Sequence, residues 1–171
     1  MTCKNFEDLP VWKAAAELYD QVDDFLDAAP PRMRPSFRDQ LERATLSVSN
    51  NIAEGFERGT TNELLAFIYI ARGSAGEVRS MLRVASRRPY LAALKTRIAS
   101  LIRLAESCSR QLRGWADSLE NSDIKGQRHL NERSKQDFER RQRAEAMQKE
   151  ILRRWPAWNP LRREAEERGE I

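Results

Sequence analysis

The chain has 171 residues, enough for one domain, or one domain with an appendage, built around a substantial core. No apolar run approaches the roughly 18 residues of a membrane span. No secretory leader is recognisable, so we expect a cytoplasmic protein with no membrane partner. Cys3 and Cys108 have no metal-binding or redox spacing, and His129 is the only histidine. These features argue against a transmembrane protein and against a disulfide-stabilised secreted domain.

Charge is distributed unevenly along the sequence. Residues 1–31 contain two lysines and seven acidic residues, whereas residues 72–117 contain nine arginines and one lysine against three acidic residues. Such asymmetry can steer self-association or attract polyanions to one face. A solvated surface of mixed charge is the alternative interpretation.

The first part of the sequence predicts two long helices, because apolar residues recur every three or four positions and strand-like alternation is absent. The first helix runs to about Ala28 and is ended by Pro30-Pro31, and the second covers about residues 36–58. At the junction of the second helix with the next, Gly55 and Gly59 offer a left-handed backbone conformation at low cost.

A third helix is predicted to begin after Thr60, which has capping-box spacing to Glu63, and to continue to about Arg87. Its interior contains Gly73 and Gly76. Each glycine costs about 1 kcal/mol relative to alanine inside a helix. We therefore expect a neighbouring helix to approach closely at these positions.

The fourth helix is predicted to follow Pro89, a residue favoured at the first helical position, and to end near Leu119. Short connections make successive helices antiparallel neighbours. The sequence therefore predicts an all-α protein whose residues 1–120 form an up-down-up-down antiparallel four-helix bundle, followed by a C-terminal helical extension.

Residues 121–171 form this charged extension. We expect a linker, a helix over about residues 131–155, a turn at Trp155-Pro156-Ala157-Trp158-Asn159-Pro160, and a frayed charged tail. Pro156 and Pro160 prevent a regular helix through the turn. Trp155 and Trp158 need a partner surface, either on the bundle or on another molecule.

No motif for catalysis or for cofactor binding occurs in the sequence. It contains no Walker loop, dinucleotide fingerprint, HExxH, paired CxxC or GxSxG. The carboxylates of the first helix resemble those of a di-metal bundle only superficially, because no Glu-x-x-His pair accompanies them. We therefore expect neither an enzyme nor a bound metal or cofactor.

Polar side chains follow one face of the second helix, beside its apolar stripe. The favoured interpretation is a hydrogen-bonded network that fixes the geometry of the bundle or of a contact between protomers. A ligand or nucleic-acid surface is the alternative. The set, completed by two residues of the third helix, is Gln40, Arg43, Ser47, Asn50, Glu54, Arg58, Ser74 and Glu77.

Arginines gather at the end of the third helix and along the fourth. Cations suit the C-terminal end of a helix dipole, and a solvated face is the commoner role for such residues. They could instead contact phosphates, with Tyr90 and the tryptophans stacking on bases. The candidates are Arg79, Arg83, Arg87, Arg88, Arg97, Arg103, Arg110 and Arg113.

Three motifs recur in an order and spacing that resemble a known family. They are Phe6-Glu7-Asp8-Leu9-Pro10-Val11-Trp12, then Gln40-Leu41-x-Arg43-Ala44 with Ser47-Val48-Ser49-Asn50-Asn51-Ile52-Ala53-Glu54-Gly55, and Ala71-Arg72-Gly73-Ser74-x-x-Glu77. Across about residues 4–118, the chain resembles the four-helix-bundle proteins encoded within intervening sequences of 23S ribosomal RNA genes. That family is in turn similar to accessory proteins of diversity-generating retroelements.

The resemblance implies a bundle that assembles into a ring, typically a pentamer, in the bacterial cytoplasm and without enzymatic activity. It also implies nucleic-acid binding and, for the retroelement relatives, binding of a reverse transcriptase and its RNA through basic surfaces. Two features depart from the family pattern. Ser49 stands where proline is common, and the extension 121–171 exceeds the usual length.

Two functional hypotheses follow. The leading one is a non-enzymatic homo-oligomer that binds structured RNA or DNA through arginine-rich surfaces, as an accessory or scaffold protein. The alternative is an adaptor that binds a protein partner through Trp155, Trp158 and the amphipathic segment 131–155.

Overall fold

The computed structural model describes residues 5–121, 132–156 and 158–169. The chain divides into two compact units, Met1–Arg128 and His129–Ile171. Cys3, His129 and the expected linker after Asn121 lie outside the described residues.

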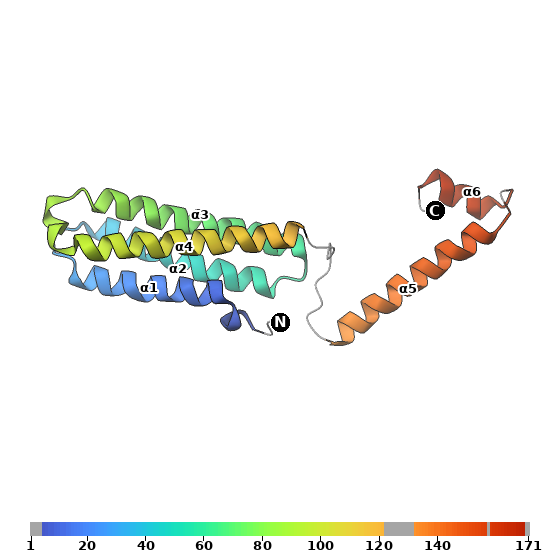
Figure 1. Ribbon diagram of the computed structural model, residues 1–171, viewed down its shortest axis with the longest axis horizontal. Coiled ribbons are helices and arrows are strands. Elements are labelled where there is room, and N and C mark those ends of the chain that lie inside the picture. The colour runs from blue at the N-terminus through green and yellow to red at the C-terminus, as the bar shows by residue number, and fades with distance from the viewer. Residues whose placement is uncertain (1–4, 122–131, 157, 170–171) are drawn as a thin grey trace. The chain divides into compact units, whose positions relative to one another are not determined.

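The first unit consists of four long helices, which Figure 1 shows lying side by side. Both α1 and α3 pack against α2 and α4, so every helix has two neighbours. Successive helices run in opposite directions, which confirms the predicted all-α, up-down-up-down bundle. The helices are α1 (Pro10–Ala28), α2 (Pro35–Glu57), α3 (Thr61–Ala85) and α4 (Lys95–Glu120), with short 3-10 helices at η1 (Phe6–Asp8) and η2 (Pro89–Leu94).

Each helix contributes one stripe of apolar side chains to a single core. Phe25 of α1, Leu41 of α2, Ile68 of α3 and Leu101 of α4 are fully buried. Burying one side chain of this size contributes about 1.5–3 kcal/mol. Because each stripe is covered by two neighbouring helices, removing any one helix would expose apolar surface on both of its neighbours.

The connection between α3 and α4 differs from the prediction. We expected the fourth helix to begin at Pro89, but residues 89–94 form the 3-10 helix η2 and α4 begins at Lys95. The Leu91 N–H donates to the Arg88 carbonyl at 3.0 Å, and Leu91 is buried. The tighter 3-10 turn reverses the chain within a few residues while still placing Leu91 in the core.

The prediction that Gly55 and Gly59 supply a left-handed backbone conformation is wrong. Neither Gly55 nor Gly59 has a positive φ. Gly55 lies in the last turn of α2, where a Cβ atom would be 2.7 Å from the Phe67 Cβ and 3.2 Å from the Leu64 Cδ1. Glycine is needed there because α2 approaches α3 closely just before the turn that joins them.

The start of α3 follows the predicted pattern. Thr60 is its N-cap, and the Thr60 Oγ1 accepts a hydrogen bond from the Glu63 N–H at 3.2 Å. Inside the helix, however, a Cβ atom on Gly73 or Gly76 would meet nothing within 4 Å. The expected close approach of a neighbouring helix at Gly73 and Gly76 is therefore wrong for the described part of the chain.

The second unit contains α5 (Glu132–Arg154) and α6 (Pro160–Glu167), which confirms the C-terminal helical extension. The prediction of an irregular tail is wrong, because α6 occupies most of it. Asn159 caps α6, its Oδ1 accepting from the N–H groups of Leu161 at 3.0 Å and Arg162 at 3.4 Å. The Asn159-Pro160 pair therefore starts a helix, with proline at its first position, as well as ending the turn.

Replacing Gly55 by alanine tests the close approach of α2 and α3. We expect Gly55→Ala to lower the free energy of unfolding by about 1–3 kcal/mol, because the new methyl group forces the two helices apart. Urea denaturation measures the change. The matched control is Gly114→Ala in α4, where a Cβ meets nothing within 4 Å. It should raise the free energy of unfolding by up to about 1 kcal/mol. Equal stabilisation of both variants would contradict the role assigned to Gly55.

Candidate nucleic-acid interface

Three of the arginines proposed to contact phosphates are paired with carboxylates. Arg83 of α3 lies 3.2 Å from Glu106 of α4, and Arg97 of α4 lies 3.1 Å from Asp24 of α1. Arg113 pairs with Asp117 one turn further along α4 at 2.6 Å, and this hydrogen bond raises the Arg113 pKa. The pairs are largely exposed and salt-screened, so they stabilise the bundle little. They do, however, reduce the positive charge that these arginines offer to phosphates.

The other five candidates are exposed and form no ion pair with the carboxylates of the described residues. Two of them line different depressions of the surface. Arg103 and Arg83 line a depression of about 290 Å³ between α3 and α4, together with Lys95. Arg88 instead lines a larger cleft at one end of the bundle. The five are Arg79, Arg87, Arg88, Arg103 and Arg110.

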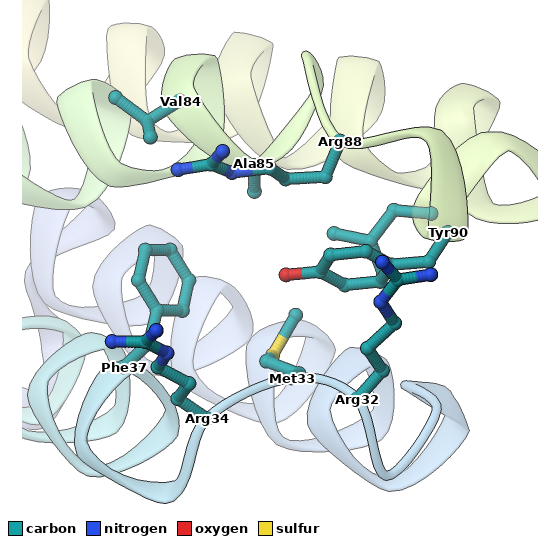
Figure 2. A pocket seen from close by; sticks show the side chains of 9 residues that line it. Arg32, Met33, Arg34, Phe37, Val84, Ala85, Arg88 and Tyr90 are labelled. Atoms are coloured by element: carbon teal, nitrogen blue, oxygen red, sulfur yellow. The ribbon is translucent and has the colours of Figure 1, made fainter.

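The larger cleft, here called the arginine-lined cleft, has a volume of about 570 Å³. It lies where the α1–α2 loop and the α3–α4 connection meet at the same end of the bundle (Figure 2). The guanidinium carbon of Arg32 is 5.5 Å from the centroid of the Tyr90 ring, a cation–π distance. The lining residues are Arg32, Met33, Arg34, Phe37, Val84, Ala85, Arg88, Tyr90 and Leu91.

Sequence reasoning missed Arg32 and Arg34. They lie in the short proline-bounded loop between α1 and α2, outside the helices along which charge recurs periodically. A signal was nevertheless present. In an up-down bundle the first and third connections lie at the same end, so this loop had to meet Arg88 and Tyr90.

Arg38 holds the loop that carries Arg32 and Arg34. Its Nη1 donates to the Leu26 carbonyl at 2.6 Å, and its Nη2 donates to the carbonyls of Ala29 at 2.7 Å and Pro30 at 3.2 Å. The last carbonyls of a helix have no partners within the helix, and a cation suits that end of the helix dipole. Arg38 of α2 therefore caps α1 and orders the loop that follows it.

The polar row along α2 makes two direct links to α3. The Gln40 Nε2 donates to the Glu77 Oε1 at 2.6 Å, and the Ser47 and Ser74 hydroxyl oxygens lie 3.1 Å apart. Asn51, which was not among the candidates, donates from its Nδ2 to the Ser47 carbonyl at 2.7 Å. These contacts lie at the edge of the α2–α3 contact, where they can fix the register of the two helices.

The rest of the row is divided. Arg43 donates to the Gln40 Oε1 at 3.2 Å. Arg58 pairs with Glu54 one turn away and lies 5.0 Å from the Phe67 ring centroid, beside the α2–α3 turn. Asn50 is exposed and makes no hydrogen bond with another described side chain or with backbone outside its helix. The row is therefore not one continuous network.

The two tryptophans of the extension have different environments. Trp155 is half-buried, and its carbonyl accepts from the Arg162 Nη1 at 2.6 Å. Trp158 is 77% exposed, and Leu161 of α6 is 55% exposed. Trp155 thus helps to connect α5 to α6, whereas most of the Trp158 side chain is exposed.

The titratable groups with shifted pKa values have structural explanations. Burial raises the pKa of the Cys108 thiol to about 11, so Cys108 is protonated at neutral pH and packs as an apolar core residue. The pKa of Tyr69 is raised mainly by its hydrogen bond to the Glu120 Oε1, which joins α3 to α4.

These helices define a small all-α bundle with two depressions that arginines line. No helix in the described residues is long and apolar enough to cross a membrane. The family model described as 23S rRNA-intervening sequence protein matches residues 7–114. The chain belongs to this family, as the sequence motifs predicted. A search of the curated proteins found no match.

Replacing Arg38 tests the assigned support of the α1–α2 loop. We expect Arg38→Ala to lower the free energy of unfolding by about 1.5–3 kcal/mol, because carbonyls at the end of α1 lose a charged donor. The control Arg103→Ala removes an equal charge from an exposed site without an ion pair to any described carboxylate, and it should change stability by less than about 0.5 kcal/mol. Urea denaturation compares the two variants. Equal effects would show that Arg38 does not cap α1.

Proposed function

We propose that this protein is a non-enzymatic accessory or scaffold protein that assembles with itself and binds structured RNA or DNA through phosphate contacts. The observation that carries the proposal is the set of exposed arginines that pair with no described carboxylate, Arg79, Arg87, Arg88, Arg103 and Arg110. Membership of the family described as 23S rRNA-intervening sequence protein supports the proposal. Because no base-reading motif accompanies these arginines, binding depends on nucleic-acid shape and backbone charge.

Self-association is supported by apolar side chains that remain exposed on the bundle. Leu46 of α2 is 40% exposed, and Ile70 of α3 is 51% exposed. Gly73 lies three residues after Ile70, and a Cβ atom there would meet nothing within 4 Å among the described residues. A glycine on an exposed helical face permits close approach of another backbone. We propose that a second copy of the chain covers this part of α3, in a ring that the family resemblance leads us to expect as a cytoplasmic pentamer.

Replacing Ile70 by aspartate tests this assembly. We expect the wild-type protein to have a solution mass that is a multiple of 19.8 kDa. Ile70→Asp should dissociate at least tenfold more readily, because the interface would bury an unpaired charge. Light scattering after size-exclusion chromatography measures both. Ser118→Asp adds the same charge on exposed α4 and serves as the control. A monomeric wild type, or equal masses for Ile70→Asp and wild type across dilution, would contradict the proposal.

Salt-dependent binding tests the nucleic-acid contacts. Fluorescence anisotropy with a structured RNA and an equal-length DNA duplex, from roughly 50 to 200 mM salt, should show affinity that falls steeply with salt. In Arg79→Gln/Arg110→Gln, the slope of log affinity against log salt should flatten by about 0.7–0.9 for each phosphate that the protein no longer neutralises. Affinity should fall equally for all sequences.

The matched control is Arg97→Gln/Arg113→Gln, which removes two charges that are already paired with Asp24 and Asp117. It should change the slope less, although the net charge changes equally. Identical effects of the two double variants would show that only net charge matters. No binding at the lowest salt would contradict the proposal.

An adaptor function is a second proposal, carried by the exposure of Trp158. A tryptophan 77% exposed, near a half-exposed Leu161, offers apolar surface for a protein partner. Such a partner could be a reverse transcriptase, as for the retroelement accessory proteins. Absence of nucleic-acid binding would make this adaptor function the leading proposal.

A further inference from the structure

The arginine-lined cleft combines an apolar interior with a cationic rim. Met33 and Leu91 are each only 2% exposed and form part of its base. Phe37 and Tyr90 are half-buried aromatic residues, and Figure 2 shows them on opposite sides of the cleft with Met33 between them. Two aromatic side chains across an opening provide surfaces on which a planar ring can pack.

The rim carries uncompensated positive charge. Arg32, Arg34 and Arg88 are exposed, and no carboxylate lies among the residues that line the cleft. In Figure 2, the side chains of Arg34 and Arg88 extend toward Phe37 from the two sides of the cleft. None of the three arginines forms an ion pair with a described carboxylate. An anion at this rim would lower the repulsion among the guanidinium groups, and phosphate suits their donor geometry.

The cleft is supported from both connections. Arg38 holds the loop that carries Arg32 and Arg34, through its hydrogen bonds to the carbonyls of Leu26, Ala29 and Pro30. On the opposite side, buried Leu91 anchors the η2 turn next to Tyr90. Because the backbone on both sides is held, a ligand would need to order only the side chains at the rim, which favours binding.

We propose that the arginine-lined cleft binds one unpaired nucleotide, with the base between Phe37 and Tyr90 and the phosphate against Arg34 and Arg88. Its volume of about 570 Å³ lies within the range of small-molecule sites, about 300–1,000 Å³. A paired base is stacked inside its helix, so the base must come from a loop, a bulge, a strand end or a free nucleotide. This inference rests on the proposed nucleic-acid binding and identifies where one base is held.

The test compares two fluorescein-labelled RNAs of equal length, a blunt duplex and a hairpin with an unpaired loop, at roughly 50 mM salt. Wild-type protein should bind the hairpin about tenfold more tightly, because stacking of one base is gained. Tyr90→Leu keeps an apolar side chain but loses the aromatic ring, so it should abolish this preference and leave duplex affinity unchanged. Arg34→Gln/Arg88→Gln should also abolish the preference for the hairpin. Arg103→Gln/Arg110→Gln should instead lower the affinity for both RNAs by the same factor.

The outcomes separate the cleft from the general proposal. Equal binding of hairpin and duplex by wild-type protein, or a hairpin preference that survives in Tyr90→Leu, would overturn the cleft while leaving polyanion binding in place. If neither RNA binds, the proposed function fails, and calorimetric titration with AMP decides the cleft separately. AMP binding that is lost in Arg34→Gln/Arg88→Gln would assign the cleft to free nucleotides. If AMP does not bind either, the proposed nucleotide site in the arginine-lined cleft is overturned. Urea denaturation of each variant verifies that it is folded.

Discussion

The rest of the bundle depends on the close approach of α2 to α3 at Gly55. The missing Cβ lets the backbone of α2 lie against Phe67 and Leu64, and the chain then reverses through the Thr60 cap. The turn sets the register of the antiparallel helices α2 and α3, and this register is kept along both helices. Ser47 contacts Ser74, and Gln40 contacts Glu77 further from the turn. Because α3 also packs against α4, the same constraint positions the other half of the core.

The opposite end of the bundle depends on a different interaction. There the α1–α2 loop and the η2 turn meet, and Arg38 donates to the carbonyls of Leu26 and Ala29 at the end of α1. A helix end that receives hydrogen bonds from a neighbouring helix as well as from its own C-cap couples loop order to helix packing. The arginine-lined cleft is thus supported by the core, although its rim residues belong to connecting segments, where binding residues are often found.

The arginines illustrate how tertiary structure divides a set that looks uniform in the sequence. Arg83, Arg97 and Arg113 have carboxylate partners, and those of Arg83 and Arg97 come from neighbouring helices. Arg88 joins Arg32 and Arg34 in a cleft whose lining includes no acidic residue. A phosphate competes with a carboxylate for the same donors. The arginines that pair with no described carboxylate are therefore the better candidates for nucleic-acid contact.

The sequence by itself determined the four helices, the antiparallel order, the cap at Thr60 and the family. These depend on local periodicity and short loops, which need no knowledge of distant contacts. It did not determine why Gly55 is glycine, that Asn159 starts a helix, or that Gly73 faces open space among the described residues. It also did not reveal the partners of the arginines or the pairing of Arg32 with Tyr90. The start of α6 is local, because Asn159 caps Leu161 and Arg162 two and three residues away. Tertiary structure decided the other features, because they depend mainly on which atoms from distant segments come within a few ångströms.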